Sequence, residues 1–389
     1  MNQSLLSLVA TVAAEVAAVI VIRALPFSLW ALVSRRVRLP EKVMALLLYA
    51  SLVVLAQSRD RLFVGALITV VEGLLYFAAA AGILAYLTTR HYLRRAPRFG
   101  ILLLCSAAFF AVPGLCFRGP AGTALLMAGW ELTFASYSYA VEGGARTGSL
   151  RDALFFLLVN PVLCYPERGG WSHDTTTLRA SWGRAAGGAL LVAAGVTTLA
   201  LVALPSMRAA GVDALGYGQF VASQGRSIVR TYFIHAGVAH LQLGLLAGAG
   251  YRAPNRYVRP WLASGPADFW RRWNAYVGSW FRRYVFLPLS LALARRLRLR
   301  AELRTSIAVL LTFAAAGLAH DVVWLISTGP LGAGVVAFCF QGVVVLGFEF
   351  ARRSAAAAYA AKPVLGIVER VGFWHTLMVM AWLLKPASG

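Results

Sequence analysis

Two polar side chains in apolar surroundings are the residues of this sequence best suited to chemistry. Asn274 ends the aromatic, arginine-containing segment Asp268-Phe-Trp-Arg-Arg-Trp-Asn, and His320 follows 46 residues later within an apolar run. Ionisable side chains at the depth of a membrane are costly, so one that is kept there usually serves a site. The pair predicts chemistry done inside a membrane, on a substrate brought to the histidine.

Each of the two residues also has a purely structural interpretation. An asparagine can hydrogen-bond to nearby backbone, and a buried histidine is often a satisfied structural residue. The positions one turn before His320 are Ala316 and Gly317, whose small side chains allow either close helix packing or a cavity for a bound chain. Asp321 is adjacent in sequence but points to a different face of a helix, so we do not expect a His–Asp dyad.

The segment around Asn274 is predicted to be an in-plane amphipathic helix at the membrane surface, within residues 266–304. Its aromatic side chains fall on one broad stripe that suits the acyl boundary, whereas its arginines lie largely elsewhere and suit headgroups. The stripe comprises Phe269, Trp273, Tyr276, Trp280 and Tyr284, and the arginines are Arg271, Arg272, Arg282 and Arg283. On such a helix Asn274 has Trp270, Gly278 and Phe281 as surface neighbours.

The elements that must position these residues are predicted to be membrane-spanning helices. Of the 389 residues, 59% are hydrophobic and only 13% are charged, whereas a soluble domain has about 25% charged residues. Because spanning backbone must satisfy its own hydrogen bonds, we expect an all-α, polytopic transmembrane bundle of about ten spans. The predicted spans are 5–33, 43–57, 62–87, 99–117, 121–141, 185–204, 227–250, 305–327, 332–351 and 371–384.

The formal net charge of +22 comes mainly from arginines in the short loops between the predicted spans. Every second loop is rich in arginine, which fits the positive-inside rule and predicts that both termini lie on the outer side. Anionic lipid headgroups, or a charged cytosolic cosubstrate such as coenzyme A, suit this distribution. We therefore expect membrane lipids, and not nucleic acid, as partners, and the oligomeric state is left open.

A single integral-membrane domain, 1–389, is the simplest organisation because the sequence has no 20–50-residue repeat and no low-complexity linker. Residues 150–165 are too apolar for water and too short to cross, which favours a re-entrant or interfacial segment. The parts of the domain are the N-terminal spans 1–141, a cytoplasmic and re-entrant segment 142–184, a core 185–327 with the Asn and His residues, and the C-terminal spans 328–389.

The other titratable residues do not indicate a metal centre. His235 and His240 are five residues apart, about 140° around a helix, and no HxxxH or HExxH pattern occurs. Glu72 and Glu131 fall within predicted spans, where they either pair with a polar neighbour or belong to an ion pathway. The ion pathway defines the alternative function, a polytopic transporter or flippase, although the sequence shows no inverted repeats.

One stretch of the chain resembles the signature of the membrane-bound O-acyltransferase family. Members show an FWRRWH-like or FWxxWN-like helix, a tryptophan six residues on, and a YVFLPL-like exit. These features match Phe269–Asn274, Trp280 and Tyr284–Leu289. A family histidine deep in a later span matches His320, and the run Asn160–Tyr165 is similar to a Pro-Thr-Leu-Cys-Tyr segment of sterol and diacylglycerol acyltransferases.

One position departs from part of that family. The branch that acylates alginate or teichoic acid carries histidine where this chain has Asn274. Asparagine is similar to the lipid-acylating branch, although the exit Tyr284–Leu289 is more similar to the glycan branch. The resemblance therefore leaves the acceptor open among lipids, sterol-like compounds, glycans and other small hydroxyl compounds.

The resemblance implies a bacterial inner-membrane, multi-pass enzyme that moves an acyl group directly from an acyl thioester, such as acyl-CoA, to a hydroxyl group. Neutral His320 would be the general base, and Asn274 would donate to the oxyanion or orient the acceptor. Acyl-CoA is a cosubstrate, and no cofactor or metal is implied. The residues expected to contact substrate are Trp270, Trp273, Arg271, Arg272, Trp280, Phe281, Arg282, Arg283 and Tyr165, with the arginines near the phosphates.

Overall fold

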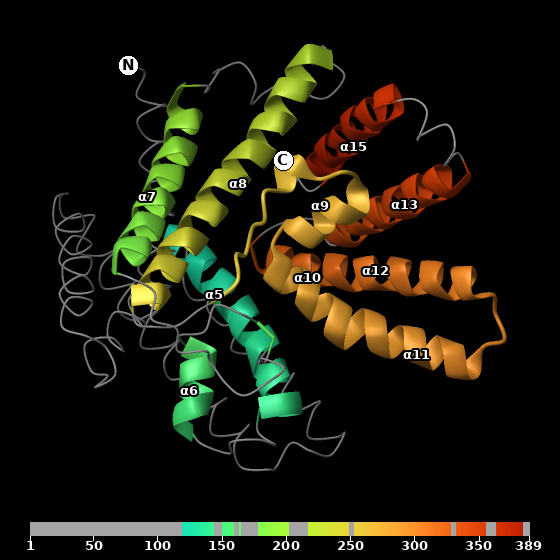
Figure 1. Cartoon of the computed structure of the whole chain (residues 1–389), viewed down its shortest axis with the longest axis horizontal. Helices are drawn as coiled ribbons and strands as arrows, with labels where there is room; N and C mark the ends of the chain where they lie inside the picture. The colour runs from blue at the N-terminus through green and yellow to red at the C-terminus, as the bar shows by residue number, and fades with distance from the viewer. Residues whose placement is uncertain are drawn as a thin grey trace. The chain divides into compact units, whose positions relative to one another are not determined.

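A computed structural model describes the part of the chain that carries both predicted catalytic residues. The described residues are 119–143, 150–158, 163–164, 178–201, 217–248, 253–327, 332–354 and 363–383. Every regular element among them is helical, as the all-α prediction requires (Figure 1). The four spans predicted between residues 5 and 117, and Tyr165, lie outside the described residues.

Six of the described helices overlap the six spans predicted in this part of the chain. They are α5 (Gly119–Ser138, continued by π-helical Tyr139–Gly143), α7 (Leu178–Leu201), α8 (Tyr217–Gly248), α12 (Ala301–Ser327), α13 (Ala333–Ser354) and α15 (Pro363–Leu383). A further helix, α6 (Leu150–Leu158), lies in the segment 150–165. Among described residues, two segments are long and apolar enough to cross a membrane, Ala301–Val322 and Ala333–Ser354. The count of ten spans and the re-entrant segment stay predictions.

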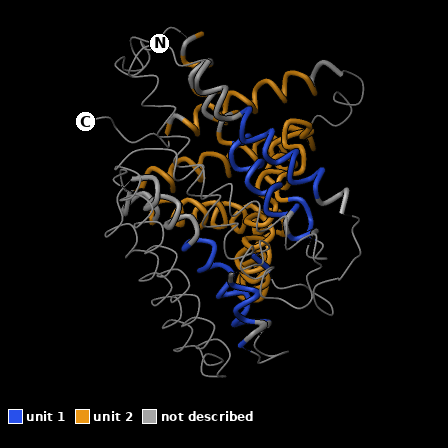
Figure 2. Tube along the Cα trace, turned by 90° about the vertical axis from the view of Figure 1, so that its left-hand side faces the viewer, with its two compact units in different colours: residues 1–203, 232–255 blue, residues 204–231, 256–389 orange. Residues whose placement is uncertain are grey.

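The described residues group into two compact units (Figure 2). One contains residues 1–203 and 232–255, and the other contains residues 204–231 and 256–389. Helix α8 contributes to both, since the division falls after Thr231. The prediction of a single domain over 1–389 stays a prediction.

Glycines bring α7 and α8 into close contact in the first unit. A Cβ atom on Gly188 of α7 would lie 2.6 Å from the Leu241 backbone nitrogen of α8. A Cβ atom on Gly244 of α8 would lie 2.7 Å from the Ala185 backbone nitrogen of α7. Such small residues let helix backbones approach and pack by van der Waals contact, as is common between helices in membranes.

The second unit is built on α12, α13 and α15, and a glycine contact also joins its first pair. A Cβ atom on Gly317 of α12 would lie 2.6 Å from the Gly334 carbonyl oxygen of α13. Farther along, a Cβ atom on Gly342 would lie 3.2 Å from the Phe313 side chain. These contacts pair an early part of one helix with a late part of the other, so α12 and α13 are antiparallel neighbours and His320 lies on the side of their contact.

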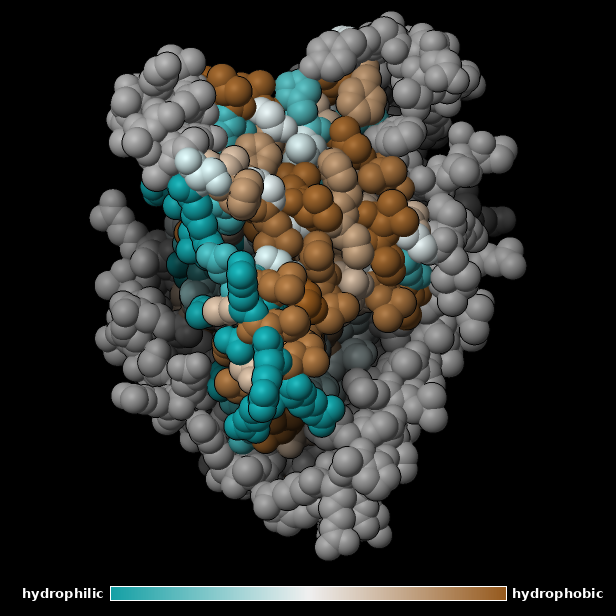
Figure 3. Space-filling view, turned by 90° about the vertical axis from the view of Figure 1, so that its right-hand side faces the viewer, coloured by the Kyte–Doolittle hydropathy of each residue, from teal (hydrophilic) through white to brown (hydrophobic). Residues whose placement is uncertain are grey.

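The outer surface of the second unit is strongly apolar. Val336, Val343 and Phe350 of α13 are 57%, 58% and 73% exposed, and they are spaced seven positions apart, so they follow one face of the helix. Hydrophobic side chains gather across one face of the molecule, with hydrophilic ones along one side (Figure 3). A contiguous exposed apolar surface of this kind is typical of a membrane-contacting protein.

Candidate active site

Asn274 does not lie within one continuous helix, which corrects the predicted in-plane helix. The helix α9 (Pro266–Arg272) ends before it, and α10 (Ala275–Phe281) begins after it. Asn274 itself has φ 43° and ψ 60°, in the left-handed region. The chain then continues as a π-helical turn, Arg282–Phe286, and as α11 (Leu287–Arg296). The amphipathic segment is thus a series of short helices with the asparagine at its main break.

A preceding non-helical segment, residues 253–259, holds this break in place. The Val258 amide donates to the Arg272 carbonyl at 3.0 Å, and the Ala275 amide donates to the Arg256 carbonyl at 2.7 Å. The Arg256 Nε–H group also donates to Asn274 Oδ1 at 2.9 Å. Asparagine tolerates the left-handed conformation better than most residues, so the break suits its side chain. Because an arginine can only donate, the atom facing it is the amide oxygen, and the Asn274 Nδ2 group carries two hydrogen-bond donors.

The tryptophans beside Asn274 belong to an aromatic cluster that joins α9 to α12, α13 and α15. The Phe269 ring stacks on Trp273 at 5.3 Å and meets Phe373 of α15 edge-on at 5.1 Å. The Trp270 ring lies 5.6 Å from Phe313 of α12 and 5.8 Å from Phe338 of α13. Phe269 and Phe338 are buried. Phe269 and Trp273, the first two members of the aromatic stripe seen in the sequence, are therefore part of a packing surface for the long helices.

His320 touches the same cluster from α12. Its ring centroid lies 4.3 Å from the ring of Phe338, which in turn contacts Trp270. Its Nδ1 lies 2.7 Å from the Ala316 carbonyl oxygen, which can only accept a hydrogen bond. In neutral His320 the proton is therefore on Nδ1 and the lone pair on Nε2. This is the tautomer that a general base acting through Nε2 requires.

Asp321 points away from His320, in agreement with the prediction of no His–Asp dyad. Its carboxylate is buried and accepts the backbone amides of Gly334 at 2.6 Å and Val335 at 3.0 Å. These amides open α13, where helix N–H groups have no intrahelical partner and favour a negative charge. Asp321 thus fixes the start of α13 relative to α12. It thereby also helps to position Phe338 of α13 against His320 of α12.

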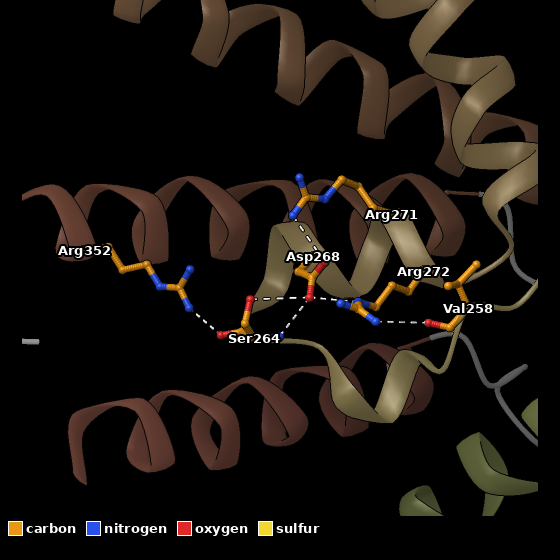
Figure 4. A network of polar contacts seen from close by, with 6 residues as sticks. All are labelled: Val258, Ser264, Asp268, Arg271, Arg272 and Arg352. Carbon is orange, nitrogen blue, oxygen red and sulfur yellow. Dashed lines mark hydrogen bonds and ion pairs between the residues drawn. The ribbon is translucent and has the colours of Figure 1, made fainter. Parts of the chain in front are cut away.

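The arginines of α9 are held by an acidic residue of the same helix (Figure 4). Asp268 accepts Arg272 Nε at 2.8 Å, Arg271 Nη2 at 3.2 Å and the Ser264 backbone amide at 3.0 Å. Burial raises the pKa of Asp268, but the hydrogen bonds from Ser264 and Arg272 and the two arginine charges outweigh it, so the net pKa is lowered. The Arg271 side chain is nevertheless 76% exposed and can meet a headgroup or phosphate.

A second ion pair, which the sequence analysis did not single out, ties this turn to α13 and α15. Arg352 Nε donates to the buried Glu369 carboxylate at 3.0 Å, and the Arg352 Nη2 group donates to the Ser264 carbonyl (Figure 4). A Cβ atom on Gly265 would lie 2.8 Å from both Arg352 and Glu369. In the sequence, this ion pair could have been suspected from the opposite charges of Arg352 and Glu369 at the two ends of a basic segment.

The other predicted contact residues lie along α10 and the turn that follows it. Trp280 and Phe281 are buried, Arg282 is exposed, and Arg283 lies 5.8 Å from the Tyr284 ring centre. Gly278 lies close to the α9 backbone, since a Cβ atom there would be 3.3 Å from the Trp270 carbonyl oxygen. Among the described residues, no group of three or more His, Cys, Asp or Glu side chains could hold a metal ion.

Part of the chain, including the described site, is similar to a family of membrane enzymes. Residues 222–382 match the model of MBOAT, the membrane-bound O-acyltransferase family. The chain is 30% identical over 134 residues, 33% of its length, to a probable long-chain-alcohol O-fatty-acyltransferase of Arabidopsis thaliana, covering 38% of that protein. It is 27% identical over 94 residues, 24% of its length, to a teichoic acid D-alanyltransferase of Streptococcus thermophilus, covering 23% of it.

A third relative is named for alginate. The chain is 29% identical over 58 residues, 15% of its length, to a probable alginate O-acetylase of Pseudomonas putida, covering 12% of that protein. The chain therefore matches well under half the length of each of these relatives. The region 222–382, which includes both Asn274 and His320, matches the model of the membrane-bound O-acyltransferase family, in agreement with the resemblance seen in the sequence motif.

Proposed function

We propose that this protein is a membrane-embedded O-acyltransferase that moves an acyl group from an acyl thioester to a hydroxyl group. The observation that carries the proposal is the position of His320 within the family region. Its imidazole lies 4.3 Å from Phe338, and Phe338 contacts Trp270 in the helix that ends just before Asn274. The helix that carries the base and the helix that ends just before the amide thus both contact one aromatic cluster.

In the proposed reaction, His320 Nε2 takes the proton of the acceptor hydroxyl as its oxygen attacks the thioester carbonyl carbon. The carbon–sulfur bond then breaks, and the thiolate leaves with a proton returned by the imidazolium. Asn274 Nδ2 donates a hydrogen bond to the oxyanion or orients the acceptor, while Arg256 holds the other end of the amide. The geometry supports this division of roles because it presents donors, and not the acceptor oxygen, away from Arg256.

We further propose acyl-CoA as the donor and the bacterial inner membrane as the location. The exposed guanidinium of Arg271 and the exposed Arg282 suit CoA phosphates at the membrane surface. The apolar outer surface of α12 and α13 suits surrounding lipid and an acyl tail. The acceptor is a hydroxyl-bearing lipid, sterol-like compound, glycan or other small molecule.

The test is acyl transfer by the purified full chain, incubated with acyl-CoA and extracted lipids or glycans. We expect an esterified product, or slow thioester hydrolysis, that the substitution His320→Ala abolishes. The matched control is His375→Ala in α15, because His375 Nδ1 makes the same bond to a carbonyl four residues earlier, Val371, at 2.8 Å. Full activity in His320→Ala would overturn the assignment of the base, and ion or lipid flux without any acyl transfer would favour the transporter alternative.

A further inference from the structure

A chain of hydrogen bonds connects α15 to the turn that precedes α9. Glu369 of α15 is buried and accepts Arg352 Nε of α13 at 3.0 Å, and the Arg352 Nη2 group donates to the Ser264 carbonyl. The Ser264 backbone amide donates in turn to Asp268 at 3.0 Å. Both backbone polar groups of Ser264 are therefore engaged, one toward the long helices and the other toward α9 (Figure 4).

The chain of bonds continues from Asp268 to the segment that holds Asn274. Asp268 accepts Arg272 Nε at 2.8 Å, and Arg272 Nη1 donates to the Val258 carbonyl at 3.4 Å. The Val258 amide returns a bond to the Arg272 carbonyl at 3.0 Å. Arg256, two residues before Val258, donates to the Asn274 amide oxygen at 2.9 Å. The ion pair between α13 and α15 is thus linked to the Asn274 side chain through hydrogen bonds and one short stretch of backbone.

The two helices that flank Asn274 are too short to fix their own position. The helices α9 and α10 have seven residues each. Helices of this length are marginal in isolation, so their position has to come from tertiary contacts. Apolar burial is non-directional, whereas a guanidinium donates hydrogen bonds in a planar fork of fixed geometry. The chain of hydrogen bonds is therefore the part of these contacts that determines how α9 is oriented.

Gly265 shows how closely the backbone lies against the ion pair. A Cβ atom on Gly265 would lie 2.8 Å from both Arg352 Nη2 and Glu369 Oε1. The turn before α9 therefore cannot move toward α15 without displacing the two charged groups. A buried charge pair adds little net stability, because the cost of desolvating the charges offsets their attraction. This favours a geometric role for Arg352 and Glu369 over a purely stabilising one.

We propose that Arg352 and Glu369 are positioning residues for the Asn274 amide, an inference that rests on the proposed function. They hold the start of α9 through Ser264, and the remaining bonds of the chain carry that position to the break at Asn274. An amide that acts on the oxyanion or orients the acceptor needs accurate placement, since a misplacement of about 1 Å can cost about 10²-fold in rate. The ion pair therefore acts on kcat, through Asn274, and not on binding of the donor.

The test measures kcat and KM for acyl transfer by the full chain carrying Arg352→Gln, which shortens the side chain and removes its charge. We expect kcat to fall by about 10–10²-fold while KM for acyl-CoA stays within about threefold of wild type. The matched control is Arg353→Gln, which should keep kcat within about threefold. Arg353 is adjacent in sequence, is 68% exposed, and lies 4.0 Å from the exposed Glu302. Unchanged kcat in Arg352→Gln would overturn the inference.

A second background shows whether the loss of rate acts through Asn274. In Asn274→Gly the amide is absent, so Arg352 has no amide to position. We expect Arg352→Gln to lower kcat by less than about a further threefold in this background, because effects that share one cause are not additive. Residues that act independently have effects that multiply. A further loss of about 10–10²-fold in Asn274→Gly would therefore contradict the inference.

Arg352→Lys keeps the comparison decisive if Arg352→Gln does not fold. Lysine keeps a positive charge beside the buried Glu369 carboxylate, but it lacks the planar fork that bonds two partners at once. Loss of one hydrogen bond should lower kcat by about threefold to tenfold, and this loss should disappear in Asn274→Gly. The same loss in both backgrounds would overturn the inference. Unfolding temperatures in detergent show which variants are folded.

The outcomes separate this inference from the proposed function. If Arg352→Gln changes nothing while His320→Ala abolishes transfer, the acyltransferase remains and the inference is wrong. If Asn274→Gly keeps full activity, there is no amide function to support, and the inference again fails while the enzyme remains. If the wild-type protein transfers no acyl group from acyl-CoA to any acceptor, the proposed function fails, and the inference with it.

Discussion

Helices α7 and α8 in one unit, and helices α12 and α13 in the other, are packed by similar means. Glycines bring the backbones together in both pairs, and each pair carries a histidine whose Nδ1 bonds to the carbonyl four residues earlier. The distances are 2.9 Å for His240 and 2.7 Å for His320. Glycine packing and a satisfied imidazole nitrogen are therefore common features of this protein and do not by themselves mark a site.

The two histidines differ in the aromatic side chains that contact them. His320 lies against Phe338, which contacts Trp270, and the helix of Trp270 ends at the break that holds Asn274. No ring contact of this kind is found for His240 among the described residues. The candidate site is therefore defined by a surface segment that packs on a helix pair, and not by a buried histidine alone.

The largest expected effect comes from exchanging the two histidines for alanine. His320→Ala should lower acyl transfer by about 10²–10⁴-fold, because a general base contributes about that much. His240→Ala should keep acyl transfer within about threefold of wild type per folded molecule. Acyl transfer measured with a radiolabelled donor checks both. Comparable losses in the two variants would remove the distinction drawn between the helix pairs.

Asn274 allows its amide and its backbone conformation to be tested separately. In Asn274→Gly the amide is removed, but glycine adopts φ 43° without strain. Activity should therefore fall by about 10²–10³-fold with little loss of stability. Asn274→Ala should lose the same activity and also about 1–2 kcal/mol of unfolding free energy, because of its left-handed backbone. Denaturation in detergent and rate measurements distinguish the two. Full activity in Asn274→Gly would exclude a direct role for the amide.

A methyl group at the α12–α13 contact should cost stability and activity together. In Gly317→Ala the new Cβ would lie 2.6 Å from the Gly334 carbonyl oxygen, and such overpacking costs about 1–3 kcal/mol. Gly347→Ala on α13 is the control, since a Cβ there meets nothing within 4 Å and replacing a helical glycine is neutral or stabilising. Gly237→Ala in α8 should destabilise as well, but its folded fraction should keep its turnover. Unchanged stability in Gly317→Ala would show that the helix contact is looser than described.

The smallest effect concerns the pH dependence of the turn before α9. The pKa of Asp268 is lowered on folding, so its stabilising contribution is complete above the unfolded value, about 3.9, and is lost as pH falls through the folded value. Wild-type protein should therefore lose thermal stability below about pH 4 more steeply than Asp268→Asn. Unfolding temperatures between pH 7 and pH 3 check this. Parallel curves for the two proteins would show that the Asp268 pairs contribute nothing.

Much of the helical architecture was predictable because hydropathy and periodicity are local properties of a sequence. The spans expected at 305–327 and 332–351 correspond to α12 and α13, within a few residues at each end. The family motif around Asn274 and the histidine at 320 were also recognisable, since each is a short run of residues. The small residues before His320 were compatible with either close helix packing or a cavity, and the structure places Gly317 in a close contact with α13.

The break at Asn274 was not predictable from the same local pattern. The aromatic spacing of the segment fits a continuous helix. The residues that end α9 and start α10 are bonded to a chain segment 14 to 19 residues earlier (Val258 to Arg272 and Arg256 to Ala275). Hydrogen bonds between segments that are distant along the chain leave no periodic signal. The Arg352 bridge to Ser264 was hidden for the same reason, since 88 residues separate its partners.

The sequence alone determined that the described chain is helical and that its surface is apolar. It also showed that a histidine and an asparagine lie in a family motif. These properties follow from composition and residue spacing, which can be read directly from the sequence. The tertiary structure decided which groups those residues face. It turned Asp321 toward the first amides of α13, directed the Asn274 oxygen to Arg256, and placed Phe338 between His320 and Trp270. The physical reason is that hydrogen-bond partners and ring contacts depend on how separate helices pack, which no single segment specifies.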